Sequence, residues 1–131
     1  MMMGKSQTVQ DKLRIFHRSF KHPVGLKYPK PSSVIDGEKN LRKKLIQEEY
    51  KELMDAISND KSDDVLKELC DLVYVCVGFA VTYGWAFDSA FNRVHASNMS
   101  KLDAEGNPVY REDGKVIKSD CYQPPNLKRL V

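Results

Sequence analysis

The stretch LIQEEYKELMDAI, residues 45–57, has the apolar spacing of an amphipathic helix but carries acids among its apolar residues. At roughly 100° per residue, Leu45 and Leu53 lie on the same side of the helix as Glu49. Glu52 lies about 60° to one side of Glu49, which is still inside the apolar arc. We therefore expect Glu49 and Glu52 on the buried face of this helix, where ionised carboxylates are uncommon.

A second stretch repeats this anomaly. In the segment 62–83, Glu68 shares its helix face with Leu72 and Val75, and Asp71 lies one turn further along the same surface. The segment is apolar nearly all round, which predicts that it is the most buried helix of the fold. Two pairs of acids, each with i,i+3 spacing, are therefore expected on the apolar faces of successive helices.

A bound cation explains why these acids are buried together. An ionised carboxylate in an apolar interior carries a large desolvation penalty, and four neighbouring carboxylates also repel one another. Arg42 lies on the same side of the helix, about two turns before Glu49, and could neutralise one acid but not four. Mg²⁺ prefers oxygen donors and is typically held by carboxylates together with substrate phosphates. We therefore predict a Mg²⁺ site, in which Mn²⁺ can substitute, with four ligands: Glu49, Glu52, Glu68 and Asp71.

Two other interpretations of the acids compete with this one. A single EExxE string is typical of solvated helix surfaces, and only the second pair on a second apolar face favours the metal. A di-iron bundle would need Glu-x-x-His motifs, and neither acid pair contains a histidine.

The charge distribution agrees with a bound polyanion: eleven basic residues and three acids precede residue 48, whereas nine acids and three lysines lie in 48–71.

The organisation of the chain is predicted to be all-α, with four to five helices forming a bundle in a single domain, residues 1–131. Helices are expected at about 6–21, 37–58, 63–83 with Ser62 as N-cap, and 87–102. The helical core thus covers about 6–102, and 103–131 form a small β-hairpin and an extended tail. Asp113–Gly114 predicts a type I′ turn in that hairpin.

The three cysteines, which lack CxxC spacing, are expected to be free thiols in the core: Cys70, Cys76 and Cys121.

Several motifs together resemble the MazG-like, all-α nucleoside triphosphate pyrophosphohydrolases. EEYKE at 48–52 and ELCD at 68–71 are similar to the EExxE…ExxD pattern of that family. Further segments are similar to its phosphoribosyl-ATP-pyrophosphohydrolase-like branch, which includes small phage MazG proteins: FHRSFKHPV at 16–24, VHASNMSKL at 94–102 and REDGKVIKSDCYQPPNL at 111–127. The resemblance covers most of the chain from Phe16 onward.

This resemblance implies Mg²⁺-dependent hydrolysis of a nucleoside triphosphate, expected to be a deoxynucleotide, to monophosphate and pyrophosphate. It also implies a homodimer or homotetramer. The attacking water is expected to be oriented or deprotonated by Glu48 or Glu49, and the sequence does not choose between them. Triphosphate contacts are assigned to Asn98 and Lys101, with Arg93 as a weaker candidate. Phe20 is expected to contact the base.

Other functions are kept as alternatives. The same fold could hydrolyse phosphoribosyl-ATP in histidine biosynthesis, or the chain could be a non-enzymatic helical adaptor that binds nucleotides or nucleic acid. The buried acids argue against nucleic-acid binding. No apolar run is long enough to span a bilayer, and the first residues lack a secretory signal, so we expect a cytoplasmic protein that binds neither nucleic acid nor membrane.

Overall fold

The computed structural model describes residues 6–25 and 36–131. The chain divides into two compact units, Met1–Phe87 with Val131, and Asp88–Leu130. The first holds α1 (Val9–Ser19), α2 (Asp36–Asn59) and α3 (Ser62–Thr82). The second holds nearly all of α4 (Phe87–Met99), and the strands β1 (Val109–Tyr110) and β2 (Val116–Ile117). This confirms the predicted all-α class with a small C-terminal hairpin, whereas the single domain over 1–131 stays a prediction.

The start of α1 is set by a capping box. The Thr8 hydroxyl accepts from the Asp11 amide at 3.1 Å, and the Asp11 carboxylate accepts from the Thr8 amide at 3.0 Å. These reciprocal bonds satisfy two amides that the helix leaves unpaired, so the helix begins at Val9, later than the predicted residue 6. It ends at Ser19, with Lys21 in a left-handed conformation (φ 59°) shortly after.

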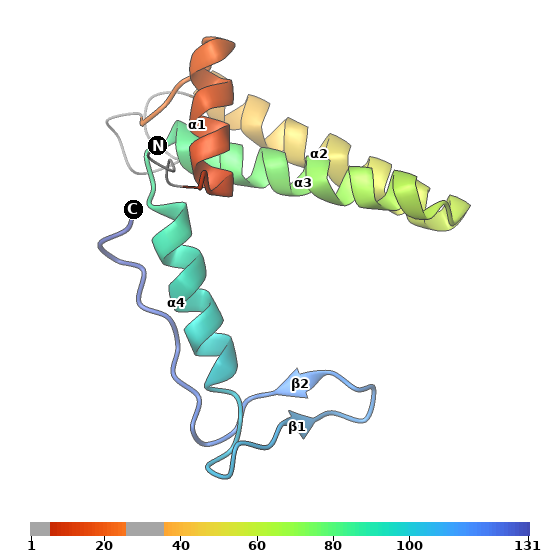
Figure 1. Cartoon of the computed structure of the whole chain (residues 1–131), viewed down its shortest axis with the longest axis vertical. Coiled ribbons are helices and arrows are strands. Elements are labelled where there is room, and N and C mark those ends of the chain that lie inside the picture. Colours follow the sequence, from red (N-terminus) through yellow and green to blue (C-terminus); the bar gives the residue numbers. More distant parts are fainter. Residues whose placement is uncertain (1–5, 26–35) are drawn as a thin grey trace, which may run out of the picture. The chain divides into compact units, whose positions relative to one another are not determined.

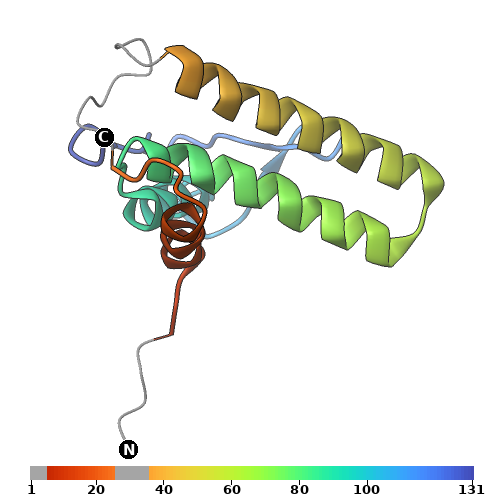
Figure 2. The same ribbon diagram turned by 90° about the horizontal axis from the view of Figure 1, so that it is seen from above.

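Helices α2 and α3 run side by side in opposite directions, and α1 crosses α3 (Figures 1 and 2). The connection from α2 to α3 consists of Asp60, which has a φ of 55°, and Lys61. Lys61 is the N-cap of α3 and makes no side-chain capping bond. The prediction of Ser62 as N-cap is therefore wrong by one residue, because the Lys61 carbonyl accepts the Val65 amide and draws Ser62 into the helix.

The core of the first unit lies where α1 crosses the second half of α3. Its centre is formed by Leu13, Val77 and Val81. Gly78 permits the close crossing, because a Cβ there would lie 3.0 Å from Nε2 of the buried His17. Deletion of a side chain from so small a core would leave a cavity that few neighbours can fill.

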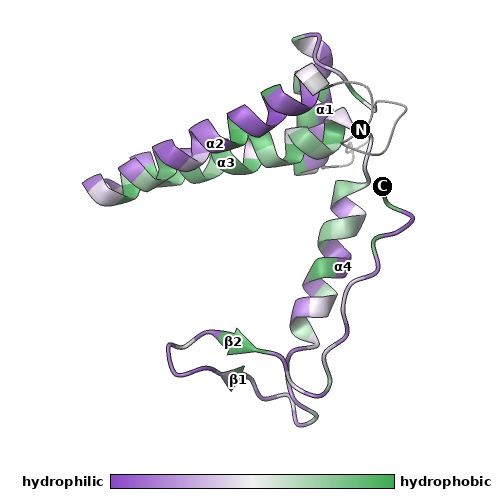
Figure 3. Ribbon diagram, turned by 180° about the vertical axis from the view of Figure 1, so that it is seen from behind, coloured by the Kyte–Doolittle hydropathy of each residue, from purple (hydrophilic) through white to green (hydrophobic). Residues whose placement is uncertain are grey.

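The first half of α3 is largely exposed, so the prediction that this helix is the most buried element holds only for its C-terminal half. Leu66 is 63% exposed and Val73 50% exposed. Figure 3 shows hydrophobic residues along α3 in this region. The reason is that α2 packs along α3 here, while α1 covers only the other end.

The three cysteines are free, as expected, but all are exposed instead of lying in the core.

A close approach between two glycines joins the segment that follows α1 to the C-terminal end of α3. Gly25 donates its amide to the Val81 carbonyl at 2.9 Å. Its Cα lies only 2.8 Å from the position that a Cβ on Gly84 would take, and Gly84 has a φ of 72°. Only glycine fits this position without strain, because other residues rarely adopt that conformation and the Cβ would meet backbone.

The second unit differs from the prediction in two local features. Helix α4 ends at Met99, three residues early, and Lys101 and Leu102 follow in tighter turns that bond to Asn98 and Met99 carbonyls. The strands pair antiparallel, with Val109 opposite Ile117 and Tyr110 opposite Val116.

The hairpin turn is not type I′, which requires positive φ at two central residues. Among the loop residues 111–115 only Gly114 has a positive φ (86°). The Asp113 carboxylate accepts from the Lys115 amide at 3.1 Å and binds the Arg111 guanidinium, and Asp113 itself does not have a positive φ. Separately, no helix in the described residues combines the length and apolar character needed to cross a bilayer.

Candidate functional site

Three of the predicted metal ligands come together in the first unit. One carboxylate oxygen from each of Glu49, Glu68 and Asp71 lies within 4.8 Å of the other two. Glu49 is brought there by α2 and the other two by α3, because the stripe of α2 that faces α3 includes Leu53 and Ala56, one and two turns after Glu49. All three side chains are partly buried.

The cluster carries negative charge that its surroundings neutralise only in part. Glu49 Oε2 and Glu68 Oε2 are both buried and have no hydrogen-bond partner among the described residues. Burial raises the pKa of Glu49, and the negative charges of Glu52, Asp71 and Glu68 raise it further. Buried acceptors that lack partners are rare in folded proteins and call for a bound water or ion as an explanation.

Glu52 lies beside Glu49 and shares a side-chain hydrogen bond with it, but neither Glu52 nor Glu48 belongs to the three-acid cluster. Glu52 is exposed, so the expectation that it lies on the buried face is wrong. The reason is that α2 packs against α3 alone among the described elements, so its buried stripe is narrower than the apolar arc in its sequence. Glu48 is also exposed and lies 3.9 Å from Lys44 Nζ. Their assigned roles in metal binding and catalysis stay predictions.

The basic residues around the acids differ from those expected. Arg42 is buried, but its Nε donates to Glu38 Oε1 at 2.7 Å, and its Nη2 lies 3.4 Å from His22 Nδ1, so it pairs with neither Glu49 nor the α3 acids. Instead, Lys67 Nζ lies 2.8 Å from Asp71 Oδ2 and 3.3 Å from Glu68 Oε1. Sequence reasoning missed this contact, although the i,i+4 spacing of Lys67 and Asp71 was a signal for it.

The residues present fit a hard divalent cation. All the clustered donor atoms are carboxylate oxygens, which Mg²⁺ and Mn²⁺ prefer, and no thiol or imidazole belongs to the cluster. The two buried oxygens without partners are atoms that a cation would satisfy. Glu49, Glu68 and Asp71 are therefore the residues that would hold the ion.

In the second unit, Lys101 belongs to a basic groove. The groove has a volume of 270 Å³ and is lined by residues from the end of α4 and from the hairpin: Lys101, Arg111, Lys115, Val116, Ile117 and Lys118. Arg111 is paired with Asp113, and Lys118 Nζ lies 4.6 Å from the centre of the Tyr122 ring. Lys101 and Lys115 form no ion pair within the described part of the chain. The predicted phosphate ligand Asn98 is exposed one turn before Lys101.

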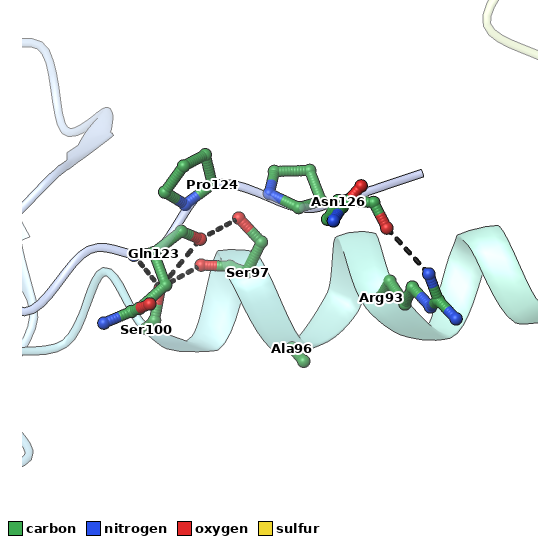
Figure 4. Close-up of a pocket in the computed structure, with 8 residues that line it drawn as sticks. Arg93, Ala96, Ser97, Ser100, Gln123, Pro124 and Asn126 are labelled. Atoms are coloured by element: carbon green, nitrogen blue, oxygen red, sulfur yellow. Dashed lines mark hydrogen bonds between the residues drawn. The ribbon is translucent and has the colours of Figure 1, made fainter. Parts of the chain in front are cut away.

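Arg93 takes part in fixing the C-terminal tail. Its Nη1 donates to the Asn126 carbonyl at 2.8 Å, and the Ser97 hydroxyl donates to the Gln123 carbonyl at 2.6 Å (Figure 4). A groove of 470 Å³ lies between α4 and the tail and is lined by no acidic residue. Arg93 thus has a structural partner, and its role in substrate binding stays a prediction.

Phe20 lies at the end of α1 with most of its surface open. It is 65% exposed, and its ring centre lies 4.5 Å from that of Phe16. Phe16 in turn packs edge-on against Tyr74 at 5.2 Å. This leaves Phe20 as the exposed ring of an aromatic cluster within the first unit.

Comparison with known protein families gives a match over most of the chain. The family model described as phosphoribosyl-ATP pyrophosphohydrolase matches residues 13–98, which include α2, α3 and nearly all of α4. The chain belongs to the phosphoribosyl-ATP pyrophosphohydrolase family. This confirms the resemblance to the MazG-like all-α pyrophosphohydrolases. The family match includes all the predicted acidic residues and ends before Lys101 and the basic groove.

One relative of this chain is the uncharacterized protein L479 of Acanthamoeba polyphaga mimivirus. It is 27% identical over 125 residues, which cover 88% of this chain and 45% of the viral protein. The chain therefore spans less than half the length of this relative.

Proposed function

We propose that the protein hydrolyses nucleoside triphosphates, preferentially deoxynucleotides, between the α and β phosphates. The products would be a nucleoside monophosphate and pyrophosphate. The observation that supports this proposal is the cluster of Glu49, Glu68 and Asp71 with two buried, unpartnered oxygens, in a chain of a pyrophosphohydrolase family. When bound, Mg²⁺ would neutralise charge on the phosphate oxygens.

The acids that are not fully engaged as ligands would activate water. In the proposed reaction a water oxygen bonds to the α-phosphorus, the bond to the bridging oxygen of the β phosphate breaks, and the water loses a proton. Glu49 is better placed than Glu48 to accept that proton, because Glu49 lies in the cluster whereas Glu48 is exposed and close to Lys44.

Asn98 and the basic groove are proposed to bind the phosphates. We expect Lys101→Gln to raise the KM for triphosphate about tenfold, with a smaller change in kcat, because one charge-assisted contact to phosphate is lost. Initial rates of pyrophosphate release over a range of substrate concentrations measure both constants. Lys128→Gln, which removes an exposed charge from the tail of the same unit, is the matched control. An unchanged KM for Lys101→Gln would remove this residue from the phosphate site.

Phe20 is proposed to contact the nucleotide base. Its exposed ring belongs to a cluster of aromatic rings and offers a surface on which a base can lie. Stacking by itself discriminates weakly between bases, so a preference for one base would have to come from polar contacts.

The central experiment is product analysis of the purified protein with each NTP and dNTP, with and without Mg²⁺. The proposal requires that nucleoside monophosphate and pyrophosphate appear as products and that no inorganic phosphate is released first. It also requires that EDTA abolishes the reaction. Phosphoribosyl-ATP should be included, because the family name indicates it as the second candidate substrate. Turnover of phosphoribosyl-ATP alone would establish that alternative, and no turnover in the whole panel would reject the proposed activity.

We also propose that the protein is a homodimer or homotetramer. Two grooves with apolar linings lie along the exposed half of α3, and Leu69 lines both of them. Burial of such a surface by a second copy would be strongly favourable. Light scattering should give a mass of twice or four times the 15.0 kDa of one chain, and 15.0 kDa at micromolar concentration would contradict this. No nucleic-acid or membrane partner is proposed.

A further inference from the structure

Lys67 is the cation that the structure places at the acid cluster. Its ammonium group contacts both acids that α3 contributes, at 2.8 Å from Asp71 Oδ2 and 3.3 Å from Glu68 Oε1. The position follows from the helix, since Lys67 and Asp71 are four residues apart and lie one above the other on the same face. These contacts raise the pKa of Lys67, so it is charged at any physiological pH.

This ammonium group satisfies only part of the cluster. It carries one positive charge against three carboxylates, and it contacts one oxygen of Glu68 and one of Asp71. Glu68 Oε2 and Glu49 Oε2 still lack partners in the described part of the protein. Lys67 is therefore a partial substitute for a divalent cation.

The lysine and a metal ion would compete for the same carboxylate groups, those of Glu68 and Asp71. Mg²⁺ and Mn²⁺ coordinate carboxylate oxygens directly, and an ammonium group on the same two carboxylates occupies one oxygen of each and repels the incoming charge. We propose that Lys67 is a built-in competitor of the metal: it holds Glu68 and Asp71 when the ion is absent and must release them before the ion can bind. This inference rests on the metal site of the proposed function.

The displacement of Lys67 is easy. Its side chain is 67% exposed, and exposed ion pairs contribute little to stability because water screens them. A lysine four residues before its acid is also the less favourable order on a helix. The apparent metal affinity is the intrinsic affinity multiplied by the fraction of molecules in which Lys67 has released the acids. We therefore expect the competition to change metal affinity by about three- to tenfold.

The test is a titration of the metal-free, full-length protein with Mn²⁺, in which electron paramagnetic resonance measures the free ion. Lys67→Gln should bind Mn²⁺ about three- to tenfold more tightly than wild type. Lys67→Arg, which keeps the charge and can still pair with both acids, should bind no more tightly than wild type. Lys61→Gln removes the same charge from the N-terminal end of α3 and should leave the affinity unchanged. Added NaCl should reduce the increase in Mn²⁺ affinity that Lys67→Gln shows over wild type, because the competition is electrostatic.

The possible results separate this inference from the proposed reaction. Equal or weaker Mn²⁺ binding by Lys67→Gln, or an equal gain in the Lys67→Arg or Lys61→Gln variants, would overturn the competition while leaving the metal site in place. A gain confined to Lys67→Gln would support the competition even if no triphosphate were hydrolysed. Absence of Mn²⁺ binding in every protein would overturn both the competition and the metal site.

Discussion

A Glu49→Gln variant is expected to lose pyrophosphohydrolase activity and, in EDTA, to melt at a higher temperature than wild type. Activity should fall by about 10²–10⁴-fold, because the variant lacks both a ligand oxygen and the group proposed to take the proton from water. Stability should rise because the change removes one of three crowded negative charges, and the raised pKa of Glu49 shows that its ionised form is disfavoured there. Pyrophosphate release and thermal melting in EDTA measure the two effects.

The opposite directions of these effects distinguish them from damage to the fold. Asp55→Asn makes the same carboxyl-to-amide change at an exposed position of α2 and should alter neither activity nor melting temperature. Retained activity in Glu49→Gln would exclude Glu49 from the reaction. A lower melting temperature would show that the three carboxylates are not mutually repulsive in the metal-free protein.

The substitution Gly84→Ala is expected to destabilise the first unit by about 2–4 kcal/mol. The φ of 72° is unfavourable for alanine by roughly 1 kcal/mol or more, and the new Cβ would lie 2.8 Å from the Gly25 Cα. Because the obstacle is backbone and not a flexible side chain, relief of the contact has to disturb the bond from the Gly25 amide to the Val81 carbonyl. Urea unfolding followed by circular dichroism measures the loss.

Gly25→Ala separates the two contributions. Gly25 has a similar φ of 65°, but a Cβ there would meet its nearest neighbour at an ordinary 3.9 Å. We expect this variant to lose only the roughly 1–2 kcal/mol due to its backbone conformation. Equal losses in the two variants would mean that the close approach of the glycines contributes nothing to the effect of Gly84→Ala.

The convergence of the acids could be predicted from the sequence because helical periodicity determines which way a side chain points. Glu49 and Glu68 lie at the centres of their apolar arcs, and both reach the interface of α2 and α3. Glu52 lies at the side of its arc, and whether such a residue is buried depends on how many neighbours the helix has. That number is a property of the tertiary structure, which periodicity does not contain.

Local hydrogen bonds account for most of the other differences. Asp113–Gly114 is a strong hairpin signal, but the side-chain bonds of Asp113 to Arg111 and Lys115 select a different turn from the one that the dipeptide favours. Similarly, the apolar pattern of the last helix continues to Leu102, whereas the backbone tightens after Met99. The contact of Arg42 with His22 was unpredictable for another reason, since His22 lies on a segment before α2 whose position no helical pattern specifies. The ion pair of Arg42 with Glu38, by contrast, has the i,i+4 spacing that the sequence shows.

The acid cluster is assembled from a single helical hairpin, since α2 and α3 are joined by Asp60 and Lys61 alone. Contacts between elements so close in the chain form early in folding, because little loop entropy has to be lost to bring them together. The carboxylates must therefore be crowded while much of the polypeptide is still unstructured. Their mutual repulsion acts on the first tertiary contacts and is expected to slow the folding of the chain as well as to weaken its native state.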